Sequence, residues 1–222
     1  MKNTITTTKE MTRCLYLSDM DGTLTRKSLV LGHAGFLIKK GIIEDTGIYG
    51  AWREDMKNEK LIVALAQDYQ RQLKDKRIED LMVDEFIEEF LGNENNWYNT
   101  LEMLIVARNF GDDVCLITGS SDFLVKELAE RLNFKWFATK YHTENGILTG
   151  EITGMFADFQ KDEVIRNNFD LSEYSTVIGL GDTASDYGIF KHCDISYLVD
   201  PTKETLEKLI VKGCKIDRII RE

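Results

Sequence analysis

The sequence is short of proline, cysteine and histidine. Only one proline, Pro201, occurs in 222 residues, so long uninterrupted helices are permitted. The four cysteines lie far apart without a C-x-x-C pair, which favours reduced core or surface thiols in a reducing cytosol. The three histidines show no metal-ligand spacing.

Basic residues and long apolar runs are scarce as well. Asp and Glu number 38 against 28 Lys and Arg, which gives a net charge of −10 and a pI of about 4.9. This balance argues against a wide face for nucleic acid or anionic lipid, although a metal ion or one lysine can still attract a small anion. No stretch approaches 18 apolar residues and the first residues lack an apolar signal region. We therefore expect no signal peptide, no membrane span and a cytoplasmic protein.

The apolar residues that are present predict an α/β fold. With 43% hydrophobic and 10% aromatic residues, the chain can bury a core as one domain with an insertion. Short apolar segments predict strands at 13–19, 113–119, 175–182 and 194–200, and helical patterns lie between the later ones. This alternation predicts a Rossmann-like parallel sheet with helices on both faces.

A long helical stretch interrupts the alternation directly after the first strand. Apolar residues recur every four positions over 61–73 and again over 78–90, and we interpret both stripes as packing faces of helices. The sequence therefore predicts an all-helical cap of residues 27–109 inserted into a catalytic core of residues 1–26 and 110–222. Further along, Asn145-Gly146 predicts the turn of a hairpin.

Polar residues follow each predicted parallel strand. They are Asp19 and Asp21 after the first, Thr118-Gly119-Ser120 after the second, and Gly181-Asp182 after the third, with Asp186 one helical turn on. Lys161 heads the predicted helix before the third strand. Because ligands of open parallel sheets bind beyond the carboxyl ends of the strands, we expect all these groups to meet at one site.

Four carboxylates at one site cannot all stay ionised without a cation. Oxygen ligands with few protein donors suit Mg²⁺, which shares a substrate phosphate. Thr118 and nearby backbone N–H groups suit that phosphate, and Lys161 can neutralise its remaining charge. One carboxylate of the Asp19/Asp21 pair can then attack phosphorus to form an aspartyl-phosphate. The other can act as acid and then as base.

Four motifs in order resemble those of the haloacid dehalogenase superfamily: "DMDGT", the threonine of "LITGS", Lys161 and "GDTASD". The helical insert after the first motif and the hairpin "ENGILTGEITG" are similar to the phosphoserine-phosphatase-like branch. The resemblance runs from about Cys14 to Leu209. It implies that Asp19 is the nucleophile and Asp21 the general acid and base.

The resemblance also implies a metal site and a phosphate site. It assigns Mg²⁺ to Asp19, the Asp21 carbonyl and Asp182, with Asp186 bracing a metal-bound water. It assigns the phosphate to Thr118, Gly119 and Lys161, with Ser185 approaching it. We therefore expect a Mg²⁺-dependent phosphatase that acts on a small-molecule phosphate monoester, with neither nucleic acid nor membrane as a partner.

Other functions compete with this interpretation. "GLGDTA" matches a dinucleotide fingerprint, but Asp182 would face the pyrophosphate and the unit has no second half. A receiver-like phosphoacceptor module shares the acids and the lysine but needs no cap. A dehalogenase would need neither the metal pair nor Asp21 as proton carrier. A phosphomutase and an inactive, protein-binding relative share every motif, so the motifs leave both open.

The predicted cap bears on the substrate. In phosphoserine phosphatases, a glutamate nine residues after the nucleophile receives the substrate's ammonium group. Here Ser28 occupies this position, give or take one, with Lys27 beside it. A neutral hydroxyl cannot replace a carboxylate, so we expect an ester without an amino group to be preferred. In the alternative, Ser28 only caps a helix and Glu44 or Asp45 does this work. Candidate carboxylate receptors are Arg53, Arg71 and Arg77.

Overall fold

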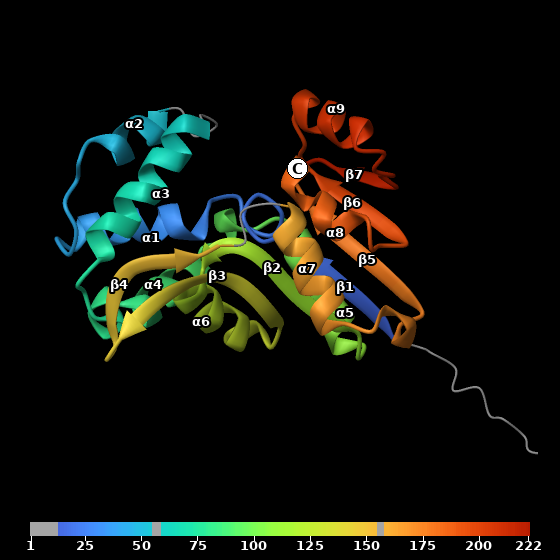
Figure 1. Ribbon diagram of the computed structural model, residues 1–222, viewed down its shortest axis with the longest axis horizontal. Coiled ribbons are helices and arrows are strands. Elements are labelled where there is room, and N and C mark those ends of the chain that lie inside the picture. The colour runs from blue at the N-terminus through green and yellow to red at the C-terminus, as the bar shows by residue number, and fades with distance from the viewer. Residues whose placement is uncertain (1–12, 55–58, 155–157) are drawn as a thin grey trace, which may run out of the picture.

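A computed structural model describes residues 13–54, 59–154 and 158–222. These residues contain one seven-stranded sheet of order β4-β3-β2-β1-β5-β6-β7 (Figure 1). The strands are β1 (Cys14–Ser18), β2 (Asp113–Ser121), β3 (Lys135–Glu144), β4 (Ile147–Thr153), β5 (Thr176–Gly181), β6 (Ile195–Val199) and β7 (Arg218–Ile220). The helices are α1 (Leu29–Lys39), α2 (Ile48–Glu54), α3 (Glu59–Leu73), α4 (Val83–Leu91), α5 (Thr100–Asn109), α6 (Asp122–Leu132), α7 (Asp158–Asn168), α8 (Tyr187–Phe190) and α9 (Lys203–Val211).

The strand order places the site-bearing strands at the centre of the sheet. β1 pairs in parallel with β2 on one side and with β5 on the other, so Leu17 lies opposite Cys115 and Gly179. Within this sheet only β3 and β4 pair antiparallel, through the predicted turn, where Asn145 and Gly146 both have positive φ. The predicted Rossmann-like parallel sheet is confirmed.

Side chains alternate across the sheet and bury both of its faces. Val114 and Leu116 of β2 pack in the cluster that contains residues of α5 and α6. Cys115 and Ile117, which point the other way, pack with Val164 of α7 and other residues of that face. Helices therefore cover both faces, as the continuous apolar strands predict.

The residues between β1 and β2 form a helical insert made of α1 to α5 and two short 3₁₀ turns, Ile78–Leu81 and Glu94–Asn96. α1, α2 and α3 contact one another, α4 packs on α6, and α5 packs on β2. The Thr100 hydroxyl of α5 also donates to the Thr23 carbonyl at 2.5 Å. Residues 27–109 as a separate cap stay a prediction. None of the described helices is both long and apolar enough to cross a bilayer.

One predicted helix is wrong. The stripe over 78–90 is not one helix, because Met82 takes a left-handed conformation between the first 3₁₀ turn and α4. The Leu81 carbonyl accepts a hydrogen bond from Nε2 of buried His33 at 2.8 Å. β2 continues through Ser120 and Ser121, and Ser121 is the N-cap of α6, which begins at Asp122.

Candidate active site

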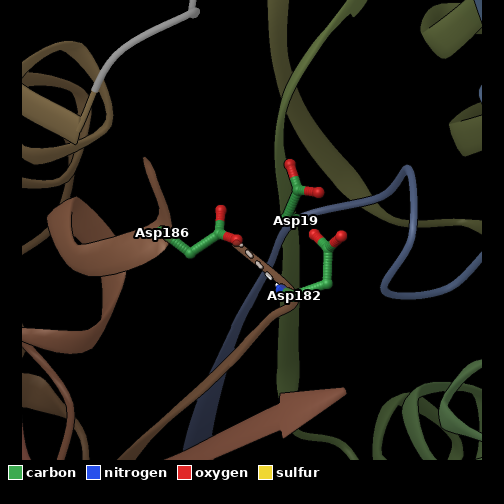
Figure 2. Close-up of side chains that lie close together, drawn as sticks. All are labelled: Asp19, Asp182 and Asp186. Atoms are coloured by element: carbon green, nitrogen blue, oxygen red, sulfur yellow. Dashed lines mark hydrogen bonds between the residues drawn. The ribbon is translucent and has the colours of Figure 1, made fainter. Parts of the chain in front are cut away.

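Three carboxylates meet beyond the carboxyl ends of β1 and β5. Asp19 directly follows β1, its backbone N–H donates to the Leu180 carbonyl at 2.9 Å, and its side chain is buried. Asp182 directly follows β5, and Asp186 lies one turn further. One carboxylate oxygen from each of the three lies within 4.8 Å of the others (Figure 2). The structure thus brings together acids that are 167 positions apart from first to last.

Lys161 completes this acidic cluster of Asp19, Asp182 and Asp186 from α7. Its ammonium Nζ lies 2.6 Å from Asp19 Oδ1 and 2.7 Å from Asp186 Oδ1, and only 2% of the residue is exposed. The second Asp186 oxygen accepts from the backbone N–H groups of Asp182 at 3.0 Å and Thr183 at 2.9 Å. Asp186 is therefore held on both oxygens, which suits a bracing group better than a direct metal ligand.

Gly22 lets the first-motif loop approach Asp182. Its φ of +83° is a conformation that other residues rarely adopt, and a Cβ at this position would lie 2.2 Å from Asp182 Oδ2. The next residue, Thr23, donates its hydroxyl to Asp182 Oδ1 at 3.3 Å. The glycine of "DMDGT" is therefore required by a close contact as well as by its backbone angle.

The Asp21 carboxylate points to the helical insert and to β2. Oδ1 accepts the backbone N–H of Leu29, the first residue of α1, at 2.8 Å. Oδ2 accepts the hydroxyl of Ser120 at 2.6 Å and that of Ser28 at 3.4 Å. Burial raises the pKa of the Asp21 carboxyl, and these hydrogen bonds act against the rise.

The end of β2 supplies the hydroxyl groups. Thr118 is buried, and its Oγ1 accepts the backbone N–H of Ser120 at 3.2 Å. The Gly119 carbonyl accepts from Thr139 Oγ1 at 2.7 Å. The sequence predicts Ser120 at this edge but assigns it no role. Its position two residues after Thr118 was a signal that it could belong to the site. That signal was weak, because the segment could be either the end of a strand or the cap of a helix.

Ser185 lies next to the acidic cluster, but its hydroxyl does not take part in the cluster's hydrogen bonds described above. Its hydroxyl hydrogen-bonds with Thr183 Oγ1 at 2.7 Å. It also lines a surface pocket together with Ala184 and with Glu207 of α9. The prediction that Ser185 approaches a phosphate stays a prediction.

The other residues considered for the substrate are spread over the insert. Ser28 is the N-cap of α1, and its hydroxyl accepts the Leu31 N–H at 3.5 Å. Arg71 pairs with Asp68 at 2.5 Å and Arg77 with Glu79 at 3.0 Å. The exposed acids Glu44 and Asp45 lie in the α1–α2 loop, and Arg53 lines a cleft of the insert.

The electrostatics of the acidic cluster fit a divalent cation. Burial raises the pKa of the Asp19 carboxyl to about 7, although the Lys161 ammonium acts in the opposite direction. Burial and the neighbouring Asp186 and Asp19 carboxylates raise the pKa of Asp182 well above its usual range. One ammonium thus cannot keep both Asp19 and Asp182 ionised, whereas a cation with two charges could. A donor set made only of oxygens is the type that Mg²⁺ prefers.

Solved structures share this fold. A Bordetella pertussis Tohama I protein of unknown function is 18% identical, with a TM-score of 0.73 over 94% of this chain and 98% of its own. A phosphoserine phosphatase in apo form is 19% identical, with a TM-score of 0.62 over 94% and 93%. Cytosolic 5′-nucleotidase IIIB bound to cytidine is 12% identical, with a TM-score of 0.63 over 94% and 80%.

Comparison at the level of sequence gives the family. No curated protein sequence matches the chain. The family model described as "haloacid dehalogenase-like hydrolase" matches residues 16–191, which include the acidic cluster, Lys161 and the whole helical insert. This confirms the resemblance drawn from the four motifs. The chain belongs to the haloacid dehalogenase-like hydrolases.

Proposed function

We propose that this hydrolase is a Mg²⁺-dependent phosphatase that cleaves a small-molecule phosphate monoester through an aspartyl-phosphate on Asp19. The observation that carries the proposal is the buried contact of Lys161 with Asp19 and Asp186, next to Asp182. The phosphoserine phosphatase and nucleotidase among the similar folds support phosphate-ester chemistry. The four free cysteines suit a reducing compartment, and we include a cytoplasmic location in the proposal.

Mg²⁺ would be held by Asp19, the Asp21 carbonyl and Asp182. When bound, the ion neutralises charge on the phosphate oxygens and on the carboxylates. Lys161 neutralises a further share of the phosphate charge, while Asp186 fixes the ammonium through its 2.7 Å contact. Thr118 and the Gly119 N–H group provide hydrogen bonds to the phosphate.

The reaction has two displacements at phosphorus. A carboxylate oxygen of Asp19 forms a bond to phosphorus, and the ester oxygen leaves with the proton that Asp21 gives it. Asp21 then takes a proton from water as the water oxygen attacks phosphorus, which breaks the Asp19–phosphorus bond and releases phosphate. The first step needs a protonated Asp21, and its burial favours that state.

For the substrate, we propose an ester without an amino group. The hydroxyl of Ser28 takes part in neutral hydrogen bonds with α1 and Asp21, and Lys27 beside it is exposed and basic. Ser28 itself offers an ammonium group no carboxylate, and the Asp21 carboxyl beside it serves as the proton carrier. The alternatives are a phosphoserine phosphatase proper, which the similar folds favour, and a phosphomutase. Phosphate release over a panel of esters, with phosphoserine included, separates these substrates by kcat/KM.

Rapid-quench labelling tests the mechanism. Wild-type protein mixed with a ³²P-labelled ester and Mg²⁺ should carry label on Asp19 within the first turnover. Asp19→Asn should carry none and should lose turnover while it keeps its thermal unfolding transition, since an amide does not attack phosphorus. The exposed Asp170→Asn serves as the matched control and should behave as wild type. A fully active Asp19→Asn protein would overturn the proposal.

A further inference from the structure

A cleft of about 540 Å³ lies in the helical insert between α1, α2 and α4. We call it the insert cleft; the residues that matter here are Lys27, Phe36, Lys39, Trp52, Arg53 and Phe90. None of its described lining residues belongs to the acidic cluster. Figure 1 shows α1, α2 and α4 at the left of the molecule, and α7, which carries Lys161, to the right of its centre. The insert cleft is therefore a second concave site in this chain.

The wall of the insert cleft is aromatic. Phe36 and Phe86 have ring centroids 5.6 Å apart, Phe86 and Phe90 are likewise 5.6 Å apart, and all three side chains are buried. Tyr49 and Trp52 of α2 form another ring pair, at 5.6 Å. Flat apolar groups pack well against such rings, which contribute about 0.5–1.5 kcal/mol per aromatic pair beyond burial.

A glycine of α1 keeps the second ring pair close to the helix. A Cβ at Gly35 would lie 1.9 Å from the Tyr49 hydroxyl oxygen, so the tyrosine rests directly on the α1 backbone. A glycine inside a helix costs about 0.5–1 kcal/mol relative to alanine. This glycine lies where α2 packs against α1, and that packing forms one side of the insert cleft.

The polar groups of the insert cleft are mostly donors. Lys27, Lys39 and Arg53 line the cleft, against a single acid, Glu89. In a chain with a net charge of −10, this local excess of basic residues is the reverse of the overall balance.

We propose that the insert cleft binds a small molecule in which an anionic group is attached to an aromatic ring. The ring packs on the phenylalanine and tryptophan side chains. The anion is neutralised by Arg53 and the two lysines. The volume of the cleft lies in the range of about 300–1,000 Å³ that is usual for sites of this kind.

The probe for this site is naphthalene-1-sulfonate, and naphthalene-1-sulfonamide is its uncharged counterpart of nearly the same shape. Calorimetric titration of the full chain should give one sulfonate per protein, bound at least about tenfold more tightly than the sulfonamide. Arg53→Gln should weaken the sulfonate about tenfold and leave the sulfonamide unchanged, because only the sulfonate carries the charge that Arg53 neutralises.

Two further variants complete the test. Trp52→Leu removes the aromatic ring, and it should weaken both probes, since each places its naphthalene ring on the wall to which Trp52 belongs. Lys126→Gln removes an exposed charge that lines a different pocket, beside α6, and should change neither affinity. Equal affinity for the two probes, an Arg53→Gln protein with unchanged sulfonate binding, or the same loss in Lys126→Gln would overturn the proposal. None of these measurements depends on phosphatase activity.

Discussion

The hydroxyl of Ser120 donates to Asp21 Oδ2 at 2.6 Å, and Ser120 is 1% exposed. This is shorter than the 3.4 Å contacts that the hydroxyl groups of Ser28 and Thr25 make with the same carboxylate. A short hydrogen bond from a buried side chain restricts where the Asp21 carboxylate can point. In the proposed mechanism, Ser120 therefore positions the proton carrier.

Replacing Ser120 by alanine should reduce turnover in a way that depends on the leaving group. We expect up to about a tenfold lower kcat for an alkyl phosphate, because a hydrogen bond to the protonated Asp21 carboxyl contributes about 0.5–1.5 kcal/mol. An aryl phosphate leaves without needing a proton, so its phosphorylation step should lose less. Single-turnover rates for both esters are the measurement.

The matched control is Ser28→Ala, which removes the same group at the longer distance and should have a smaller effect. Asp21→Asn supplies the upper limit of the loss, since general acid catalysis typically contributes ~10²–10⁴-fold. Equal losses for alkyl and aryl esters in Ser120→Ala would show that the residue acts on the fold and not on the proton carrier.

Much of the acidic cluster could be predicted because parallel strands deliver their last residues to one edge. Asp19 and Asp182 follow apolar strands in the sequence, and this pattern places both at the same edge of the sheet, whereas the structure shows that β1 and β5 are neighbours. The direction of Asp21 could not be predicted, since it depends on the position of α1 relative to β2. The break in the helix at Met82 depends likewise on His33, which lies 49 residues earlier and donates a hydrogen bond to the Leu81 carbonyl. Contacts between residues so far apart leave no periodic pattern in the sequence.

Removing divalent cations should eliminate turnover. EDTA leaves the carboxylates of Asp19 and Asp182 without the charge that would keep them ionised, and excess Mg²⁺ should restore the rate. Ca²⁺ should inhibit, because its larger and looser coordination shell displaces Asp19 from phosphorus. Asp182→Ala should raise the Mg²⁺ concentration needed for half-maximal rate, whereas the exposed Asp170→Ala should not. Unchanged rates in EDTA would contradict the metal assignment.

Replacing Gly22 by alanine should disable the site more than it destabilises the fold. The new Cβ would overlap Asp182 Oδ2, so the carboxylate must move, and both kcat and Mg²⁺ affinity should fall. Gly41→Ala is the matched control: its φ is +72°, close to the +83° of Gly22, but a Cβ there would meet open space. Both variants should lose about 1–3 kcal/mol of stability from backbone strain. If Gly41→Ala lost as much activity as Gly22→Ala, strain and not the contact with Asp182 would be the cause.

His33 should make the stability of the fold depend on pH. The ring is buried; because the Leu81 carbonyl can only accept, Nε2 carries the proton and Nδ1 accepts from the Tyr69 hydroxyl at 2.7 Å. Burial lowers the pKa of His33 from 6.5 to about 4. Between these two values the unfolded chain binds a proton that the folded chain does not, so the free energy of unfolding falls as pH falls from 6.5 towards 4. The full difference corresponds to roughly 3 kcal/mol.

Urea unfolding at several pH values between 7 and 4 measures this dependence. His33→Gln should be less stable than wild type at pH 7, because it disturbs the bonds to Leu81 and Tyr69, but its stability should fall less steeply with pH. The aspartates and glutamates titrate in both proteins, so the difference between the two slopes isolates the histidine. Identical slopes would show that His33 takes up its proton in the folded protein as readily as in the unfolded chain.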